Sequence, residues 1–508
     1  MSKGALAGID LGAGSLKVSI IDERGKLLGS GSAPVETLAL RPGWSEQEPD
    51  DWWTALCIAV PIAIRNSGIP ADTIKAVSFS AGAHTCVLVD ADDKVVRPAI
   101  LWNDQRSLAE CEILRSQTEF TIEATAGNAI TPTWTLPQLY WLKRHQPEAL
   151  SNVRRLYPAK DYLRSRLTGD WSTDPIDAAG TLMFDQTAGG WSAPICEQIG
   201  WPVESLPPIG PSEAVAGHIT REAAQASGLP IGIPVVRGSS DTAVEALGSG
   251  MLGPETGTIK LATAATLSCF SHAPAEDNAL ITYPYLLPGS WYLITGTNSC
   301  ASAHAWLRKT LFSCGGKEMA SFAEMDHLAS EVLPGAEGLF FHPYLNGERT
   351  PYWDPKLRAD FVGFGFNHGP GHVVRAFYEG VAYALCDCLK VFKTKQISFS
   401  SARITGGGSQ SAVWRQIVAD ALEIPIELPV AADASYGAAL LAGIGTGMFS
   451  DFESLDGVIE IAARNDPNPA NFKTYRQGVE TYRHIQRELS PIYRAIHDAR
   501  HEQNVIGG

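Results

Sequence analysis

The stretch GIDLGAGSLKV, residues 8–18, places a glycine-rich turn between two segments with the composition of β-strands. Residues 5–10 are typical of a buried strand, and residues 16–22 and 27–33 of two further strands. A Walker phosphate loop or a dinucleotide-binding loop leads from a strand into a helix, with a GK[ST] or a G-x-G-x-x-G pattern. Neither spacing occurs in this stretch. The turn therefore predicts a hairpin and argues against both nucleotide-binding loops.

The same local order recurs further along the chain. Residues 257–270 again read as a strand, a turn of small and hydroxyl-bearing residues, and a strand. Residues 402–422 read as a strand, three glycines and a helix, and in 233–251 a strand leads into a small-residue helix headed by Asp241. This repetition predicts a duplicated α/β unit with one nucleotide-facing hairpin in each half and a boundary near 245–256.

Length and helical periodicity extend this division. A single hydrophobic core rarely grows beyond roughly 250–300 residues, so a chain of 508 residues is expected to form two domains. We expect an N-terminal domain over 1–250, a C-terminal domain over 251–450 and a helical extension over 451–508. The main helices are expected at 49–68, 135–150, 159–169 and 475–496.

The net charge restricts the kinds of partner expected for this chain, and the cysteine pattern indicates the redox state of its compartment. The chain has 40 basic and 55 acidic residues, a net charge of −15, which argues against nucleic acid or an anionic membrane as the main partner. Its longest apolar run, near WTALCIAVPIAI, is too short to span a bilayer, and no signal peptide is visible. Nine scattered cysteines without a CxxC motif are typical of a reduced, cytoplasmic protein.

The glycine turn suggests a phosphate site. Backbone N–H groups of Gly12, Ala13, Gly14 and Ser15 can approach phosphate oxygens closely, and the turn at Thr263 could do the same from the second half. Asp10 would repel a phosphate directly, but a Mg²⁺ ion between them makes a carboxylate useful there. The alternative left open is that each glycine hairpin is only a turn.

Several longer stretches together resemble the FGGY family of carbohydrate kinases, which have the actin/hexokinase/Hsp70-like ATPase (ribonuclease H-like) fold. The resemblance covers about residues 5–445, and its xylulokinases are the most similar members. The stretches that carry it are GIDLGAGSLKV (8–18), GWSEQEPDDWW (43–53), RPAILWNDQRS (97–107), AKDYLRSRLTGDWSTDPIDAAGT (159–181), GSSDTAVEALGSG (238–250), NGERTPYWDP (346–355) and GGGSQSAVWRQIVADAL (406–422).

The resemblance implies two duplicated α/β domains with a cleft between them and a role for particular residues. Asp241 matches the family's catalytic base, although an Asp heading a helix also serves as an N-cap. The residues that match the family's sugar-binding positions are Ala83, His84, Asn103, Asp104, Asp241 and Thr242. The residues that match the family's nucleotide-binding positions are Gly12, Ala13, Gly14, Ser15, Thr263, Gly407 and Gly408. Asp10 and Asp241 are the expected Mg²⁺ ligands. A lone histidine such as His84 is otherwise more often structural.

The expected function is ATP- and Mg²⁺-dependent phosphorylation of D-xylulose to D-xylulose 5-phosphate, with sugar and ATP as small-molecule partners and a homodimer left open. The triplet AHT at 83–85 and the pair Asp241-Thr242 depart from the usual xylulokinase residues, and ATA at 262–264 lacks the family's GTS-like turn. Kinases for another ketose, a polyol or an aldonate, such as ribulose or gluconate, therefore stay open. A nucleotide switch or binding protein on the same fold is the alternative of a different class.

Overall fold

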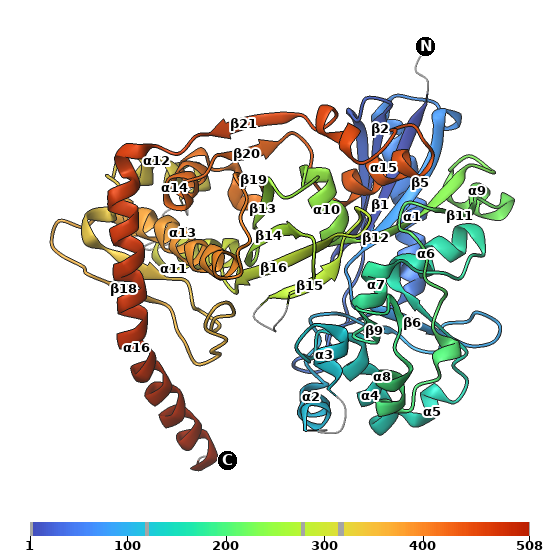
Figure 1. Ribbon diagram of the computed structural model, residues 1–508, viewed down its shortest axis with the longest axis horizontal. Coiled ribbons are helices and arrows are strands. Elements are labelled where there is room, and N and C mark those ends of the chain that lie inside the picture. The colour runs from blue at the N-terminus through green and yellow to red at the C-terminus, as the bar shows by residue number, and fades with distance from the viewer. Residues whose placement is uncertain (1–3, 117–120, 276–279, 313–319, 507–508) are drawn as a thin grey trace. The chain divides into compact units, whose positions relative to one another are not determined.

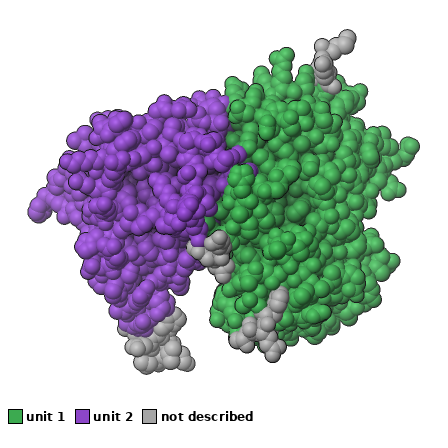
Figure 2. All heavy atoms as spheres, in the orientation of Figure 1, with its two compact units in different colours: residues 1–252, 271–293, 431–460 green, residues 253–270, 294–430, 461–508 purple. Residues whose placement is uncertain are grey.

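The computed structural model describes residues 4–116, 121–275, 280–312 and 320–506, and its elements are labelled in Figure 1. Contacts divide the chain into two compact units, coloured in Figure 2. Unit 1 comprises residues 1–252, 271–293 and 431–460, and unit 2 comprises residues 253–270, 294–430 and 461–508. Each unit is therefore assembled from stretches that are far apart in the sequence. The division at 250 and 450 stays a prediction.

Unit 1 contains a six-stranded sheet of order β11-β12-β5-β1-β2-β3. Strands β1 and β2 form the predicted antiparallel hairpin, β3 extends it, and β5 and β12 run parallel to β1. The bounds are β1 Ala5–Leu11, β2 Ser15–Asp22, β3 Leu27–Pro34, β5 Ile74–Ala81, β11 Val215–His218 and β12 Pro234–Ser240.

Helices cover both faces of this sheet. A Cβ on Gly8 would lie 1.9 Å from the Ser435 carbonyl oxygen of α15 (Ala434–Gly445), so the strand and this helix are in close backbone contact. Gly8 pairs with Ser19, which pairs with Ser30, so Gly31 points to the opposite face. There a Cβ on Gly31 would lie 2.4 Å from the Ala59 carbonyl oxygen of α1 (Pro49–Ser67). Glycines at these positions thus allow the two helix layers to pack tightly on the sheet.

A second, small sheet of unit 1 has the order β4-β7-β6-β8. The expected helix over 135–150 is wrong as one element: α4 ends at His145 and α5 begins at Pro147, because Pro147 has no N–H to continue the first helix. The bounds are β4 Glu46–Gln47, β6 Cys86–Val89, β7 Ala99–Ile100, β8 Arg155–Pro158, α2 Leu108–Arg115, α3 Ile122–Ala126, α4 Thr135–His145, α5 Pro147–Leu150, α6 Ala159–Thr168, α7 Pro175–Ala179, β9 Phe184–Asp185, β10 Gly190–Trp191, α8 Ala193–Ile199, α9 Arg221–Ser227 and α10 Asp241–Ser249.

The second large sheet has the order β15-β16-β14-β13-β19-β20-β21. From β16 onward it repeats the pattern of the first: β13 and β14 form a hairpin, β19 and β20 continue in parallel, and β21 is antiparallel at the edge. The duplicated α/β architecture is thereby confirmed. The bounds are β13 Thr256–Leu261, β14 Ala265–Ser271, β15 Ile281–Pro284, β16 Trp291–Thr297, β19 Ser401–Thr405, β20 Ile426–Pro429 and β21 Ile461–Asn465.

Unit 2 is built around a long buried helix, α13, and closes with α16 (Figure 1). Its remaining elements are α11 Ala301–Leu311, α12 Phe322–Ser330, β17 Phe340–His342, β18 Asp360–Val362, α13 Pro370–Thr394, α14 Ala412–Leu422 and α16 Phe472–Ile506. None of the helices in the described part of the chain combines the length and apolar character that a bilayer crossing requires. The eight cysteines described are free thiols, and Cys314 lies outside the described residues.

Candidate active site

Three predicted segments of unit 1 follow three neighbouring parallel strands. Leu11, the last residue of β1, pairs with Ala81 at the end of β5, and Ala81 pairs with Ser240 at the end of β12. The glycine turn, the segment beginning at Gly82 and the head of α10 therefore leave the sheet at the same edge. Ligands of open α/β sheets bind at this carboxyl edge. Strand register thus brings together residues more than 200 positions apart.

Asp10 lies on β1 one residue before the glycine turn. Its Oδ1 accepts a hydrogen bond of 2.8 Å from the hydroxyl of Ser80, its register partner on β5. Burial, followed by the charge of Asp241, raises the pKa of Asp10 to about 8. A carboxyl oxygen held beside a second carboxylate suits a hard divalent cation, because the cation favours the ionised form that burial and Asp241 oppose.

The glycine turn is fixed through its carbonyl groups. The Gly12 N–H donates across the turn to the Ser15 carbonyl, at 3.0 Å. The Ala13 carbonyl accepts from Thr37 and Gln47, at 3.0 and 2.7 Å. Because the carbonyls face these partners, the tip of the turn keeps its shape and leaves its exposed residues available for a ligand.

Asp241 is the first residue of α10, and Ser240 is the N-cap, so the N-cap alternative for Asp241 is wrong. Its Oδ1 accepts from the Thr242 N–H at 2.7 Å and from the Thr242 hydroxyl at 3.2 Å. Oδ2 lies 4.0 Å from the point where a Cβ on Gly82 would sit, and Cδ1 of Trp102 lies 3.6 Å from that point. Gly82 therefore leaves room beside Oδ2 that any side chain would reduce.

His84 stands in the left-handed backbone region, with φ 73°, and its ring is fixed on both nitrogens. Nδ1 lies 2.7 Å from the Gly180 carbonyl oxygen, and Nε2 lies 3.2 Å from the Tyr283 hydroxyl. A carbonyl only accepts, so Nδ1 carries the proton and Nε2 is an acceptor. Burial lowers the pKa of His84 to about 4, which keeps the ring neutral near pH 7.

Asn103 and Asp104 differ in orientation. Asn103 is exposed, as is its neighbour Trp102, and both lie on the loop after β7. Asp104 is fully buried, and its carboxylate accepts from the Ser45 N–H at 2.6 Å and pairs with Arg106 at 2.7 Å. This geometry favours a role for Asp104 in holding the loop rather than in touching a ligand. Ala83, half-buried, and Thr242, exposed, lie beside His84 and Asp241.

The predicted residues of unit 2 also meet at one edge. Strands β13 and β19 are parallel, with Lys260 paired to Thr405, so the turn at Thr263 and the glycines after Thr405 follow neighbouring strand ends. A Cβ on Gly406 would lie 2.5 Å from the Leu261 carbonyl oxygen, whereas one on Gly407 would meet open space. Gly408 packs against Trp414. Thr263, Gly407 and Gly408 are thus brought together, and their nucleotide-binding role stays a prediction.

Sequence reasoning missed some of the polar and aromatic groups around these residues. Ser80 became visible only through strand register. Lys17 forms an ion pair of 2.8 Å with Asp433, the N-cap of α15, and against the effect of burial this pair lowers the pKa of Asp433. Tyr283 comes from a distant segment that carries no motif. The aromatic neighbours of His84 also include Trp134, whose ring centroid is 4.5 Å away.

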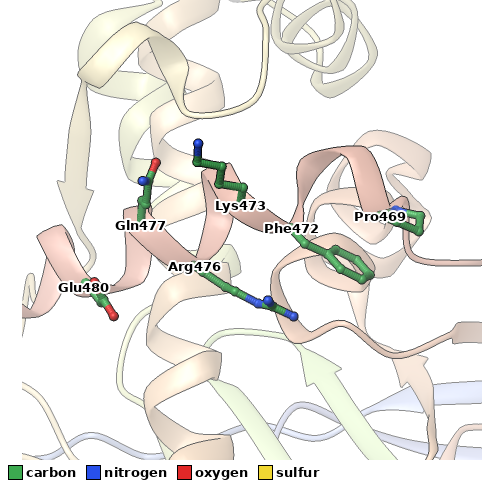
Figure 3. Close-up of a pocket in the computed structure, with 6 residues that line it drawn as sticks. All are labelled: Pro469, Phe472, Lys473, Arg476, Gln477 and Glu480. Atoms are coloured by element: carbon green, nitrogen blue, oxygen red, sulfur yellow. The ribbon is translucent and has the colours of Figure 1, made fainter.

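Two features of the described residues bear on other sites. No group of three or more His, Cys, Asp and Glu side chains has metal-binding geometry there, although Mg²⁺ needs only one or two carboxylates beside phosphate and water. A hollow of about 400 Å³ lies along the start of α16, where Figure 3 shows side chains spread along the helix rather than converging on one point. Its residues are Pro469, Phe472, Lys473, Arg476, Gln477 and Glu480, none of which is a predicted site residue.

Comparison with known proteins gives a family match in each half of the chain. The N-terminal domain of the FGGY family of carbohydrate kinases matches residues 5–248, and the C-terminal domain of that family matches residues 258–446. The xylulose kinase of Escherichia coli is 31% identical over 489 residues, covering 96% of this chain and 99% of that protein. The gluconokinase of Bacillus subtilis is 26% identical over 509 residues, covering 97% and 98%. A crystal structure of a xylulose kinase from Brucella ovis is 30% identical with a TM-score of 0.88, covering 96% and 100%.

Proposed function

Since the chain belongs to the FGGY family of carbohydrate kinases, and is a sugar kinase that uses ATP as its phosphate donor, we propose that its acceptor is D-xylulose and its product D-xylulose 5-phosphate. Two of the relatives described above are xylulose kinases, which supports this sugar. The gluconokinase relative makes D-gluconate the first alternative acceptor, and ribulose or a polyol are further ones.

Asp241 is the proposed general base, and its geometry carries the proposal. Thr242 occupies Oδ1 with two hydrogen bonds, which fixes the plane of the carboxylate and leaves Oδ2 beside the space at Gly82. A sugar hydroxyl there would donate its proton to Oδ2 as its oxygen attacks the γ-phosphorus. Because phosphoryl transfer has a loose transition state, Asp241 acts mainly by orienting the hydroxyl and capturing its proton late in the step.

The two hairpin turns are the proposed phosphate-binding elements of their units. In unit 1 this element is the turn of Gly12 to Ser15, which is exposed at Ala13, Gly14 and Ser15, and in unit 2 it is the turn at Thr263. Gly407 and Gly408 would face the nucleoside. Glycine at Gly407 leaves open space for a ligand, whereas Gly408 is required for packing against Trp414.

Asp10 is the proposed holder of Mg²⁺, with Asp241 as the second carboxylate. Its Oδ1 is oriented by Ser80, and its raised pKa reflects negative charge that a cation would compensate. When bound, the ion would neutralise charge on the phosphate oxygens of ATP. The Asp10 carboxylate must be ionised to hold it, so metal binding releases a proton from this residue at neutral pH.

Coupled measurement of ADP release tests the acceptor. The unmodified enzyme is given MgATP with D-xylulose, D-ribulose, D-gluconate, glycerol and further polyols, each against a reaction without sugar. We expect D-xylulose to give the highest kcat/KM. A higher value with D-gluconate would move the proposal to that acid, and sugar-independent hydrolysis of ATP would favour a nucleotide switch.

A further inference from the structure

A chain segment that lies between two stretches of unit 2 packs in unit 1, next to the predicted sugar-site residue His84. Residues 271–293 cluster with unit 1, although residues 253–270 before them and 294–430 after them cluster with unit 2. Within this segment, β15 spans Ile281–Pro284. From this strand, the Tyr283 hydroxyl lies 3.2 Å from Nε2 of His84.

Asn128 holds the backbone of β15 at two points. Its Nδ2 donates to the Thr282 carbonyl at 2.8 Å, and its Oδ1 accepts from the Thr282 N–H at 2.9 Å. Gln186 adds a donor to the same carbonyl at 3.2 Å. Both Asn128 and Thr282 are buried, at 1% and 0% exposure, so these bonds are protected from water. Since a strand alternates its side chains, fixing Thr282 also fixes the direction of Tyr283.

The Tyr283 ring is held between aromatic neighbours. Its centroid lies 5.2 Å from that of Tyr292, with the ring planes 16° apart, and 5.9 Å from that of Trp134. The residue is 5% exposed. Burial raises the pKa of Tyr283 well above its usual range, and the carboxylate of Asp241 adds to this effect. The Tyr283 hydroxyl lies 3.2 Å from Nε2 of His84, which places Tyr283 beside that predicted sugar-site residue.

The Tyr283 hydroxyl has one direction left for hydrogen bonding. Its proton is donated to Nε2 of His84, because Nδ1 of that ring already donates to the Gly180 carbonyl. The phenolic oxygen then offers only lone pairs to a ligand. A sugar hydroxyl can donate to such an oxygen, whereas a carboxylate, which only accepts, is repelled by it.

We propose that Tyr283 is a sugar-binding and specificity-determining residue that accepts a hydrogen bond from a hydroxyl of a neutral sugar, and that Asn128 is the residue that positions it. This inference rests on the proposed function and deepens it. The site would select an uncharged ketose or polyol and disfavour an aldonate whose carboxylate reaches Tyr283. Neither residue was apparent from the glycine and aspartate motifs.

Steady-state kinetics with Tyr283→Phe tests the first part, using D-xylulose or whichever neutral sugar the unmodified enzyme prefers. Loss of one neutral hydrogen bond predicts a rise in sugar KM of about five- to tenfold, with kcat within about threefold and the KM for MgATP unchanged. Tyr285→Phe is the matched control, since Tyr285 lies on the same segment and donates to the Met251 carbonyl at 2.8 Å. A sugar KM within twofold of the unmodified enzyme, or an equal rise in Tyr285→Phe, would overturn the assignment.

A double-mutant cycle with Asn128→Ala tests the second part. If Asn128 acts through Tyr283, the double variant raises the sugar KM no further than Asn128→Ala alone. Multiplicative effects of the two substitutions would overturn the positioning role. These failures are separable from failure of the proposed function, which is measured on the unmodified enzyme. A preference of that enzyme for D-gluconate would contradict both, whereas D-xylulose turnover that is indifferent to Tyr283→Phe would contradict this inference alone.

Discussion

Ser80 and Asp10, register partners on adjacent parallel strands, are joined by a hydrogen bond of 2.8 Å at the edge of the sheet where the proposed site lies. The bond orients a carboxylate whose protonation is shifted by its surroundings. Burial and the charges of Asp241, Asp433 and Glu245 oppose ionisation of Asp10, and the Ser80 hydroxyl favours it. The balance leaves a pKa of about 8, so the folded protein holds a proton that the unfolded chain releases near pH 4.

This difference predicts how Asp10→Asn changes stability with pH. Between about pH 4 and pH 8 the native state binds one more proton than the unfolded state, so the unfolding free energy of the unmodified protein falls as pH rises through this range. An amide does not titrate and removes that loss. After discounting for solvent access, we expect Asp10→Asn to stabilise the protein by about 2 kcal/mol more at pH 8 than at pH 5.

Urea unfolding in the presence of EDTA measures this effect without a contribution from bound metal. Asp185→Asn is the control, because the Asp185 carboxylate likewise accepts hydrogen bonds, here from two backbone N–H groups at 2.9 Å, but lies outside the site. A pH-independent effect of Asp10→Asn would show that Asp10 is ionised in the native state.

The close packing at Gly437 predicts that a substitution there disturbs the proposed base, Asp241. A Cβ at this position would lie 1.8 Å from the Val244 carbonyl oxygen of α10, so α10 and α15 touch through backbone. Gly437→Ala must push away the helix that begins with Asp241. We expect a loss of about 1–3 kcal/mol of stability and a fall in kcat that exceeds the change in the KM for MgATP.

Thermal unfolding and kinetics of Gly437→Ala are compared with those of Gly190→Ala, where an added Cβ meets no atom within 4 Å. Equal behaviour of the two variants would contradict the close contact between α10 and α15.

Lys160 predicts the largest loss of stability. It is fully buried, with its Nζ 2.7 Å from Asp161 and 3.0 Å from both Asp174 and Asp177. Lys160→Met leaves Asp174 and Asp177 without their cation, whereas Asp161 keeps its ion pair with Arg164, and breaking such a network costs about 3–5 kcal/mol. Urea unfolding should give a markedly lower midpoint, whereas Lys75→Met, on the exposed surface, should leave it unchanged. An unaltered midpoint in Lys160→Met would mean that the carboxylates are protonated or solvated.

Local patterns in the sequence predict much of the fold. The hairpins at 8–18 and 257–270 are confirmed, because turn chemistry and strand alternation act over a few residues. The break between α4 and α5 at Pro147 follows from local chemistry that the apolar periodicity obscured. The family resemblance is confirmed by matches to both of its domains.

Long-range placement accounts for what sequence reasoning missed. Asp104 has the residue type expected of a ligand-binding carboxylate, but its bonds to Ser45 and Arg106 hold the carboxylate in the protein interior. Tyr283 reaches His84 only because the segment around β15 joins unit 1. Such contacts depend on the register and packing of segments distant in the sequence, which residue types and spacing alone do not specify.

The most direct test of the central claim compares catalysis and binding in Asp241→Asn. If Asp241 is the base, this variant lowers kcat for sugar phosphorylation by roughly 10²–10⁴, while the dissociation constant of D-xylulose measured by calorimetry stays within about threefold. A kcat within tenfold of that of the unmodified enzyme, with binding intact, would contradict the assignment of Asp241 as the catalytic base.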